Sequence, residues 1–424
     1  MEVTSHKSRL EGTVEVPPSK SHTIRAVILG ALAHGKSVIE DPLDSFDTRS
    51  AVEAVRAFGA RVEKDQHQWI ITGVEGKPHV PEDVINVGNS GTTLYMIMGT
   101  ASLVDGWTVL TGDEQIRQRT ALPLMEALEG LGVKTLSTRG NGKAPLMIKG
   151  PMKGGRTTVR GISSQYVSSL IMACPLARND SEISVIELNE RPYIQMTLNW
   201  LDFLGVSPLI DDNMNYIRIQ GRKSYTQFIR KIPGDFSSAT FLLCAGVLAG
   251  GTISLRGLEM DDPQGDKIVI DILKRMGAHI EIRDDLIIVK GGRLKGIEID
   301  MNSIPDAVPM LAVCACFAGG TTVLANVPQA RIKETDRIAV MSVELTKLGA
   351  NVEELPDGLV IQGTGLKGGH VHGHGDHRVV MALTVAGYAA DRPVSIDTAE
   401  AVGVTFPRFW ETMRSLGAKI EMKS

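Results

Sequence analysis

The chain is 424 residues long, 43% hydrophobic and 22% charged, with a formal net charge of −4. These values are typical of a globular protein with two domains or one large barrel, and they exclude a disordered or fibrous chain. A charge balance so close to neutral supplies no general basic field, so we expect no nucleic-acid partner and only locally built anion sites.

The N-terminus and the cysteines argue against secretion and membrane insertion. The first seven residues, MEVTSHK, lack the apolar core of a signal peptide, and no apolar run reaches 18 residues. The four cysteines lie in apolar runs without C-x-x-C spacing, which favours buried side chains in a reducing compartment. We therefore expect a cytoplasmic protein whose cysteines hold no metal.

A helix-to-strand junction recurs along the chain. Each copy has an apolar residue, a glycine and then Ala or Val before an alternating strand, and the glycines are Gly59, Gly132, Gly205, Gly277, Gly349 and Gly417. Glycine readily adopts the left-handed conformation that often ends a helix. Because successive glycines lie 68 to 73 residues apart, we predict six copies of one α/β unit, three in each of two domains.

A polar corner between a strand and a helix repeats with the same period. The corners lie at residues 18–21, 88–91, 162–165, 234–237, 304–307 and 375–378. They are rich in Ser, Asp and Asn, which cap helix N-termini, and the free N–H groups there also attract anions. Capping alone would explain any single corner, whereas corners that converge through pseudo-symmetry would form anion sites.

A domain boundary is predicted at residues 228–235, where a basic strand meets Pro-Gly. The strand at residues 12–17, the first one predicted, resembles the strand that begins after this boundary, so we expect it to pair with the C-terminal half. One domain would comprise residues 1–17 and 234–424, and the other residues 18–233. Ligand clefts usually form between domains, so we expect the active site there.

From PSKSHTIRA at residues 18–26 onward, the chain resembles the enolpyruvyl transferase family, in particular its 5-enolpyruvylshikimate-3-phosphate synthase branch. Further matches, in order, are GNSGTT at 88–93, LTGD and RQR within 110–119, SSQ at 163–165, RPY at 191–193, IPD at 304–306, RIKETDR at 331–337, GDHR at 375–378 and TFP at 405–407. The resemblance implies an α/β (α+β) fold of two lobes, each with three βαβαββ-type repeats in pseudo-threefold arrangement.

The resemblance also implies an activity. The enolpyruvyl group of phosphoenolpyruvate would pass to the 5-hydroxyl of shikimate 3-phosphate, with release of phosphate, by addition and elimination. This reaction belongs to the shikimate pathway of aromatic amino acid biosynthesis. We expect a monomer whose only partners are these small molecules, with no nucleic acid, membrane or cofactor, and whose lobes close when ligands bind.

The resemblance assigns residues to the two substrates, which together carry four anionic groups that Lys, Arg and helix ends can hold. The implied phosphoenolpyruvate ligands are Lys20, Gly91, Arg119, Gln165, Arg337 and Arg378. The implied shikimate 3-phosphate ligands are Lys20, Ser21, Arg25, Ser163, Ser164, Gln165, Tyr193, Asp306, Gln329 and Lys333. Asp306 would take the hydroxyl proton, Glu334 would protonate the methylene carbon, and Lys20 would act as a further acid or electrostatic stabiliser.

Simpler interpretations compete with several of these assignments. Residues 333–337 would also suit an exposed, ion-paired helix start. Asp306 would also serve as a plain N-cap after a proline, and Arg119 taken alone would be a solvated arginine. The assignment to chemistry therefore rests on the ordered set of motifs and not on any single member.

Four positions depart from the family pattern. Val404 stands where Lys is usual, Tyr95 where Arg is common, Glu190 where Ser commonly helps to bind the acceptor phosphate, and Gln329 where Asn is common. Loss of the lysine is expected to weaken phosphoenolpyruvate binding by about 1.5–3 kcal/mol and to alter sensitivity to its mimic glyphosate. A glutamate beside a phosphate is repulsive unless protonated or paired, and Arg191 is the expected partner.

Two other functions stay open. Transferases that act on UDP-N-acetylglucosamine usually carry a Cys in the segment corresponding to residues 111–119, which has none here, but another phosphorylated acceptor remains compatible with Glu190. A catalytically impaired homologue that binds anionic ligands is the second alternative. Retention of the implied acid, base and arginines argues against it.

Two further motifs are set aside. GTGLKG at residues 363–368 matches a dinucleotide-binding loop, but it leads into a predicted strand and not into a helix. His370, His372 and His374 would share one face of that strand, and we expect surface histidines there and not metal ligands. His377, in the GDHR corner, is expected to orient the site.

Overall fold

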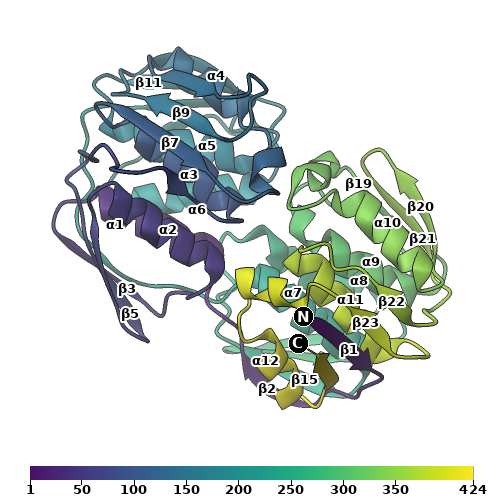
Figure 1. Cartoon of the computed structure of the whole chain (residues 1–424). Coiled ribbons are helices and arrows are strands. Elements are labelled where there is room, and N and C mark those ends of the chain that lie inside the picture. Colours follow the sequence, from purple (N-terminus) through teal and green to yellow (C-terminus); the bar gives the residue numbers. More distant parts are fainter. Residues whose placement is uncertain (424) are drawn as a thin grey trace. The chain divides into compact units, whose positions relative to one another are not determined.

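The computed structural model describes residues 1–423. These divide into two compact units: unit 1 comprises Met1–Pro17 and Pro233–Ser424, and unit 2 comprises Pro18–Ile232. Each unit is built around its own hydrophobic core. Figure 1 shows the helices and strands of each unit with the labels used below.

Within the described residues, unit 2 contains three four-stranded sheets with one common pattern. Its strands are β3 (Lys36–Glu40), β4 (Arg61–Lys64), β5 (Gln68–Thr72), β6 (Ile85–Asn86), β7 (Trp107–Thr111), β8 (Lys134–Ser137), β9 (Leu146–Lys149), β10 (Gly155–Arg160), β11 (Ser181–Ile186), β12 (Leu209–Ile210), β13 (Tyr216–Ile219) and β14 (Ile229–Lys231). The sheet orders are β14-β3-β5-β4, β6-β7-β9-β8 and β10-β11-β13-β12. In each sheet the first two strands run parallel and the other pairs antiparallel.

Unit 1 repeats this pattern in its described part. Its strands are β1 (Glu2–His6), β2 (Gly12–Glu15), β15 (Thr252–Arg256), β16 (His279–Arg283), β17 (Leu286–Lys290), β18 (Glu298–Asp300), β19 (Thr321–Ala325), β20 (Asn351–Leu355), β21 (Gly358–Gln362), β22 (Gly369–Val371), β23 (Val394–Ile396) and β24 (Lys419–Lys423). The sheet orders are β16-β17-β15-β2, β18-β19-β21-β20 and β22-β23-β1-β24. The predicted α/β fold of six βαβαββ-type repeats is confirmed.

Two helices accompany each sheet. In unit 2 they are α1 (Lys20–Leu32), α2 (Phe46–Ala57), α3 (Gly91–Ala101), α4 (Leu122–Gly130), α5 (Ser164–Ala173) and α6 (Arg191–Phe203). In unit 1 they are α7 (Phe236–Ala249), α8 (Val269–Met276), α9 (Val308–Cys316), α10 (Arg337–Lys347), α11 (His377–Ala389) and α12 (Phe409–Ser415). Short 3₁₀ helices add η1 (Ile116–Gln118), η2 (Cys174–Leu176), η3 (Gly265–Ile268), η4 (Pro305–Ala307), η5 (Pro328–Ile332) and η6 (Ala399–Val404).

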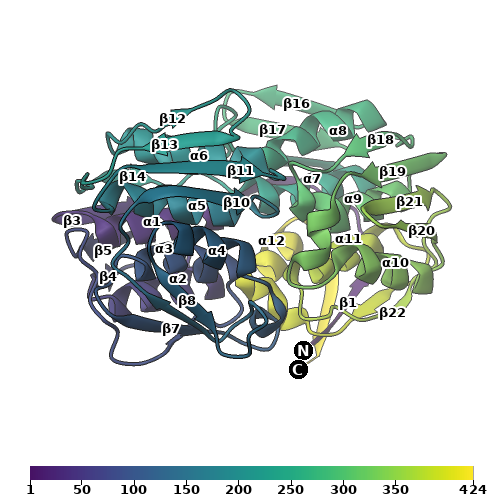
Figure 2. The same cartoon turned by 90° about the horizontal axis from the view of Figure 1, so that it is seen from above.

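The first helix of each repeat lies in the core of its unit. Every residue of α3 is buried, as expected for a helix that is apolar on all sides. It packs against both α1 and α5, while α7, α9 and α11 pack against one another in pairs. In Figure 2, the sheets of unit 2 surround α1, α3 and α5. The starts of these inner helices are the predicted polar corners.

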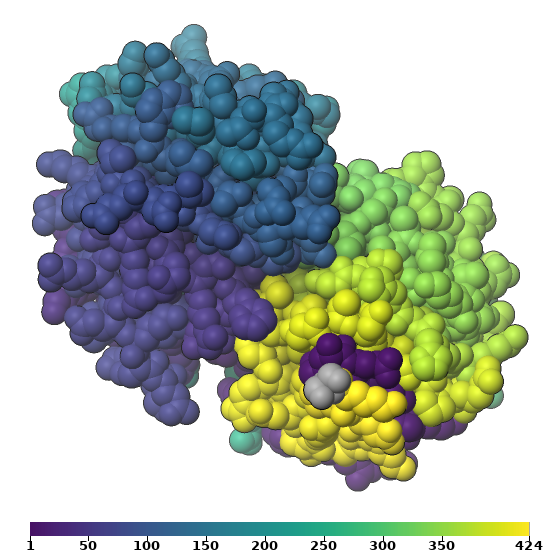
Figure 3. Space-filling view, viewed as in Figure 1, coloured from purple at the N-terminus to yellow at the C-terminus, as the bar shows by residue number. Residues whose placement is uncertain are grey.

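β2 and β14 each pair with a strand that is far away in the sequence. β14 pairs in parallel with β3. β2 pairs in parallel with β15, with Val14 opposite Leu255, which confirms the predicted pairing of this strand with the C-terminal half. β1, which the sequence reading missed, runs antiparallel to both β23 and β24. Figure 3 accordingly shows the N-terminal residues among the C-terminal ones on the surface of unit 1.

The six predicted helix-ending glycines all adopt left-handed backbone conformations, with φ between 74° and 107°. Five of the six corners carry the predicted N-cap, a side chain that accepts a backbone N–H one turn into the helix: Ser19, Ser90, Ser163, Asp235 and Asp376. The corner at 304–307 differs, because it forms η4 and then α9 without a side-chain cap. The alternative that Asp306 is an N-cap is therefore wrong.

The loop at residues 363–368 leads into β22, as predicted. β22 ends at Val371, so His372 and His374 lie beyond the strand, and the expectation that three histidines share one strand face is wrong. Among residues 1–423, no helix combines the length and the apolar character that a membrane span requires.

Candidate active site

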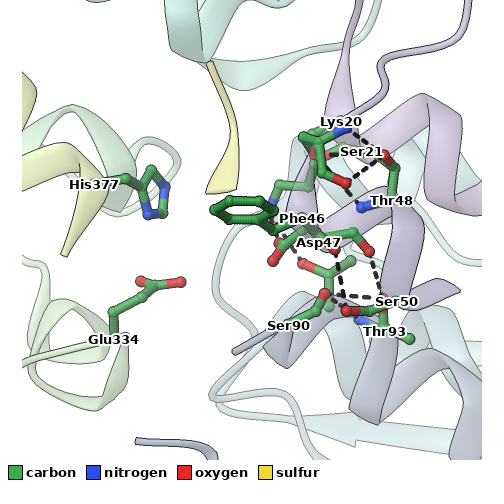
Figure 4. A network of polar contacts seen from close by, with 12 residues as sticks. Lys20, Ser21, Phe46, Asp47, Thr48, Ser50, Ser90, Thr93, Glu334 and His377 are labelled. Carbon is green, nitrogen blue, oxygen red and sulfur yellow. Dashed lines mark hydrogen bonds and ion pairs between the residues drawn. The ribbon is translucent and has the colours of Figure 1, made fainter. Parts of the chain in front are cut away.

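The first residues of α1, α3 and α5 in unit 2 meet at one hydroxyl group. Lys20 Nζ donates to Thr92 Oγ1 over 3.3 Å, and Gln165 Nε2 donates to the same oxygen over 2.9 Å. Lys20 Nζ also lies 3.3 Å from Asp47 Oδ2, and the Asp47 side chain is only 5% exposed. Figure 4 shows Lys20 and Asp47 among the polar side chains of this region. Two residues proposed for phosphoenolpyruvate are thus brought together.

Gly91 and Arg119 fit against each other. A Cβ atom at position 91 would lie 2.0 Å from Arg119 Nη1, so any larger residue would displace the guanidinium from the start of α3. Arg119 is only 8% exposed, so the alternative of a solvated arginine is wrong. The close approach gives a physical reason for glycine at this position.

Tyr95, one of the departures from the family pattern, fixes the residue after Arg119. The hydroxyls of Tyr95 and Tyr166 donate to the Thr120 carbonyl over 3.0 and 2.7 Å. Their rings meet edge to face, with centroids 4.9 Å apart. Because both tyrosines are buried, this contact fixes the backbone from which Arg119 projects.

The corner at the start of α5 holds Ser163 and Ser164. Ser163 accepts the Gln165 N–H as N-cap over 3.3 Å. The N–H and hydroxyl of Ser164 both donate to Glu190 Oε2, over 3.2 and 2.7 Å. Arg191, the partner expected from the sequence, has an exposed side chain. One of the two serines proposed for the acceptor phosphate, Ser164, thus holds a carboxylate of the protein itself.

Arg25 joins α1 to α6 from inside the core. Its Nη1 donates to the Ser21 carbonyl and its Nη2 to the Tyr193 carbonyl, both over 3.0 Å. Its Nε donates to Thr197 Oγ1 over 2.7 Å. Burial lowers the pKa of Arg25 to about 9, so it keeps its charge at neutral pH. Arg25 is therefore placed to fix the backbone of two other predicted site residues, Ser21 and Tyr193.

In unit 1, Arg337 binds three carboxylates. Its Nη1 lies 2.7 Å from Asp306 Oδ1, its Nη2 2.5 Å from Glu334 Oε2 and its Nε 2.8 Å from Asp376 Oδ2. The Arg337 side chain is 0% exposed, so the alternative of an exposed ion-paired helix start is wrong for this arginine. The pKa of Arg337 is raised by Asp376, Glu334 and Asp306 although burial acts to lower it.

Asp306 lies between two arginines. Besides Arg337, its Oδ2 contacts Arg378 Nη2 over 2.9 Å. Burial acts to raise the pKa of Asp306, but Arg378, Lys333 and Arg337 together hold it below its ordinary value. The carboxylate is therefore ionised at neutral pH, as a proton acceptor must be.

Gln329 and Lys333 lie in and directly after η5. Gln329 is 3% exposed and its Nε2 donates to the Asn302 carbonyl over 2.8 Å. Lys333 is half-buried and close enough to Asp306 to lower its pKa. The two residues thus approach the Asp306 region from the neighbouring segment.

His377, the first residue of α11, is 1% exposed. Burial lowers its pKa to about 3, against the opposing effect of Glu334, so the ring is neutral above that pH. Within residues 1–423, neither ring nitrogen has a hydrogen-bond partner. Figure 4 shows the ring beside the Glu334 carboxylate. That His377 orients the site stays a prediction.

The predicted residues divide between the units. Unit 2 contains Lys20, Ser21, Arg25, Gly91, Arg119, Ser163, Ser164, Gln165 and Tyr193, and unit 1 contains Asp306, Gln329, Lys333, Glu334, Arg337 and Arg378. Sequence reasoning missed three polar neighbours, Asp47, Thr92 and Asp376. Thr92 and Asp376 lie inside motifs already singled out, whereas Asp47 carries no signal beyond its place near a helix start. Residues 1–423 contain no group of three or more His, Cys, Asp or Glu side chains able to hold a metal ion.

Six βαβαββ repeats form the fold of an enolpyruvyl transferase, and Lys20 at the start of α1 and Arg378 in the first turn of α11 supply cations of the kind that its anionic substrates require. A sequence model of the family EPSP synthase (3-phosphoshikimate 1-carboxyvinyltransferase) matches residues 4–413. The chain belongs to this family, whose members are transferases.

Named relatives agree with this assignment. The 3-phosphoshikimate 1-carboxyvinyltransferase of Acetivibrio thermocellus is 52% identical over 98% of both chains. That of Methanococcus vannielii is 42% identical over the full length of both. Among solved structures, EPSP synthase from Acinetobacter baumannii is similar with a TM-score of 0.82, at 27% identity over 99% of this chain and 100% of that one.

Proposed function

We propose that this chain transfers the enolpyruvyl group of phosphoenolpyruvate to the 5-hydroxyl of shikimate 3-phosphate and releases phosphate. One observation carries the proposal beyond family membership. The Asp306 carboxylate is ion-paired with two buried arginines, Arg337 and Arg378, and such a set suits a base beside a site for an anionic substrate.

The addition step makes one bond and moves two protons. The acceptor's 5-hydroxyl oxygen attacks C2 of phosphoenolpyruvate, and Asp306 takes the hydroxyl proton. The C2–C3 double bond becomes a single bond, and C3 takes a proton from Glu334 to become a methyl group. The elimination step then breaks the bond between C2 and the phosphate oxygen. Glu334, which gave up its proton in the addition step, takes one methyl proton back, so the double bond is restored, and inorganic phosphate leaves with the proton that Asp306 took from the hydroxyl.

The ligand assignments follow from charge and position. We propose that Lys20, Arg119 and Gln165 hold the phosphate of phosphoenolpyruvate, and that Arg337 and Arg378 hold its carboxylate. The remaining predicted ligands would bind shikimate 3-phosphate. Arg and Lys at helix starts supply preorganised positive potential where negative charge develops in the reaction.

The arginine contacts suggest how the base is activated. Arg378 and Arg337 lower the pKa of Asp306, which makes it a weak base. When the substrate's carboxylate takes over part of their hydrogen bonding, the pKa of Asp306 rises toward its ordinary value. Binding of phosphoenolpyruvate thereby makes Asp306 a stronger proton acceptor.

The test is release of phosphate from phosphoenolpyruvate with and without shikimate 3-phosphate. We expect release only with the acceptor, and its loss in Asp306→Ala. Asp300→Ala, which removes an exposed aspartate of β18, is the matched control and should retain the activity. No release from a folded protein that still binds phosphoenolpyruvate would show that the acceptor is wrong. Release without acceptor would refute transfer altogether.

We further propose that the enzyme acts as a monomer in the cytoplasm. All four cysteines are free and buried, which is compatible with a reducing compartment. Light scattering of the purified protein tests the oligomeric state, and a mass of twice 45.7 kDa would refute the monomer.

A further inference from the structure

The start of α5 already carries an anion that belongs to the protein. Oε2 of Glu190 accepts both the N–H of Ser164, over 3.2 Å, and its hydroxyl, over 2.7 Å. Glu190 is 3% exposed and Ser164 1% exposed, so this contact lies inside unit 2. The two residues are 26 positions apart in the chain.

Free N–H groups at a helix N-terminus bind phosphate and carboxylate groups for the same reason. Both are anions that accept hydrogen bonds from these donors and interact favourably with the helix dipole. The two kinds of anion cannot share one set of donors, because they repel each other and need the same space. The Glu190 carboxylate and a phosphate are therefore alternatives at Ser164.

The position of Glu190 is fixed by the backbone. It directly precedes α6 with φ 55° and ψ 41°, a left-handed conformation that is uncommon for a residue other than glycine. Its side chain does not cap α6, but reaches across to α5 instead. The carboxylate is thus directed at the neighbouring helix start and not at its own.

We propose that Glu190 determines how tightly the enzyme binds the phosphate of its acceptor. In the unliganded protein its carboxylate occupies the position at Ser164 that the acceptor's phosphate takes, and the phosphate must displace it. Glu190 therefore weakens binding of shikimate 3-phosphate, and of inorganic phosphate at the same position. It does not affect the contacts made by the shikimate ring. This inference rests on the proposed function.

The experiment is calorimetric titration of shikimate 3-phosphate, shikimate and inorganic phosphate into the full chain and its Glu190 variants. Glu190→Ser removes the carboxylate and leaves a small hydroxyl, while Glu190→Gln keeps the shape and removes only the charge. We expect the dissociation constant of shikimate 3-phosphate to fall about tenfold in the Ser variant and less in the Gln variant, as for gain of one charge-assisted contact. The dissociation constant of inorganic phosphate should change in the same order. Shikimate, which lacks the phosphate, should bind with equal affinity to the wild type and both variants.

Glu187 provides a matched control. It is a glutamate three positions earlier, also left-handed with φ 54°, but its side chain is 53% exposed and paired with Arg160. Glu187→Ser should leave the binding of all three compounds unchanged.

The outcomes separate this inference from the proposed function. Unchanged or weaker binding of shikimate 3-phosphate by both Glu190 variants, in a wild-type enzyme that turns it over, would overturn the role of Glu190 and leave the activity intact. Tighter binding of shikimate as well would also overturn it, because the effect would then not concern the phosphate. If neither the wild type nor any variant binds shikimate 3-phosphate, the proposed function fails and this inference fails with it.

Discussion

Arg337 Nη1 lies 2.7 Å from Asp306 Oδ1, although the two residues are 31 positions apart. The same guanidinium donates through Nε and Nη2 to both oxygens of Asp376, which is fully buried. Asp376 therefore holds the arginine that contacts the proposed base and the proposed acid. Removing its charge tests how much this buried network contributes to the fold.

Asp376→Asn is expected to lower the free energy of unfolding by about 3 kcal/mol, because it leaves part of a buried charge uncompensated. The amide oxygen can still accept the Arg378 N–H, now 2.9 Å from Oδ1, so the helix cap is kept. The amide NH2 group then replaces the oxygen that accepts from Arg337 Nε, so the charge and this hydrogen bond are lost together. Urea denaturation at pH 7 measures the effect.

Asp336→Asn is the control for this prediction. Asp336 also caps a helix, accepting the Ala339 N–H over 3.0 Å, and also pairs with an arginine, Arg331, over 2.7 Å. Its side chain is 36% exposed, so the loss should stay below about 1 kcal/mol. Equal losses in the two variants would contradict a special contribution of the buried network.

Gly91→Ala is expected to raise the KM for phosphoenolpyruvate by about 10- to 100-fold, the range for loss of one hydrogen bond to a charged group. The added Cβ would lie 2.0 Å from Arg119 Nη1, so the guanidinium must move. Steady-state kinetics with each substrate varied in turn measure the effect, and the KM for the acceptor should change much less.

A double-mutant cycle shows whether Gly91 acts through Arg119. If it does, Gly91→Ala should add little to the KM of an Arg119→Ala enzyme, since the displaced group is already gone. Additive effects would mean that the new methyl group disturbs the start of α3 in another way.

The repeat architecture could be predicted because its signals are local. Each helix-ending glycine needs a left-handed backbone where it stands, and each capping serine or aspartate bonds to its own helix. β1 escaped detection because its short segment alternates weakly and its partners lie far away in the sequence, about 390 positions away in β23 and more than 410 in β24. Short strands that depend on distant partners carry little signal of their own.

The candidate site could be predicted as a set of residues but not as a set of contacts. Family resemblance supplied Asp306, Arg337 and Arg378, while their mutual ion pairs depend on how three helix starts pack together. Asp376 reads as a simple N-cap in the sequence and is in addition the counter-ion of Arg337. Glu190 stands out in the sequence as a departure from the family pattern, but its contact with Ser164 depends on the packing of α5 against α6.

Val404→Lys is expected to tighten phosphoenolpyruvate binding about tenfold, because it restores a cation that the family pattern contains. Val404 ends η6 and is 7% exposed, so the new ammonium group loses hydration unless an anion pairs with it. The ligand-free variant should therefore be less stable than the wild type, and phosphoenolpyruvate should restore more stability to it.

Val404→Met separates charge from size in this test. It lengthens the side chain at the same buried position without adding a cation, so phosphoenolpyruvate affinity should stay at the wild-type value. Calorimetric titration of both variants measures the difference. Equal affinities would count against the alignment of Val404 with the family lysine.

The stability of the protein should depend on pH in a way that shows that His377 is buried and neutral. Burial lowers its pKa from 6.5 to about 3, so between these values the unfolded chain binds a proton that the folded chain excludes. The contribution of His377 to stability is therefore fully present above pH 6.5 and is lost as the pH falls toward 3. By linkage this amounts to about 2 kcal/mol between pH 6.5 and 4.5.

His377→Gln removes the titrating group, so its free energy of unfolding should fall less than that of the wild type between pH 6.5 and 4.5. The slope is the change in the free energy of unfolding between these two pH values. The buried carboxylates titrate in both proteins, so their contribution cancels when the two slopes are subtracted. His67→Gln, at a histidine whose side chain is 78% exposed, should keep the wild-type slope. Urea denaturation at the two pH values measures all three proteins. A wild-type slope in His377→Gln would mean that the ring takes up its proton in the folded state, and that His377 is then a cation beside Glu334.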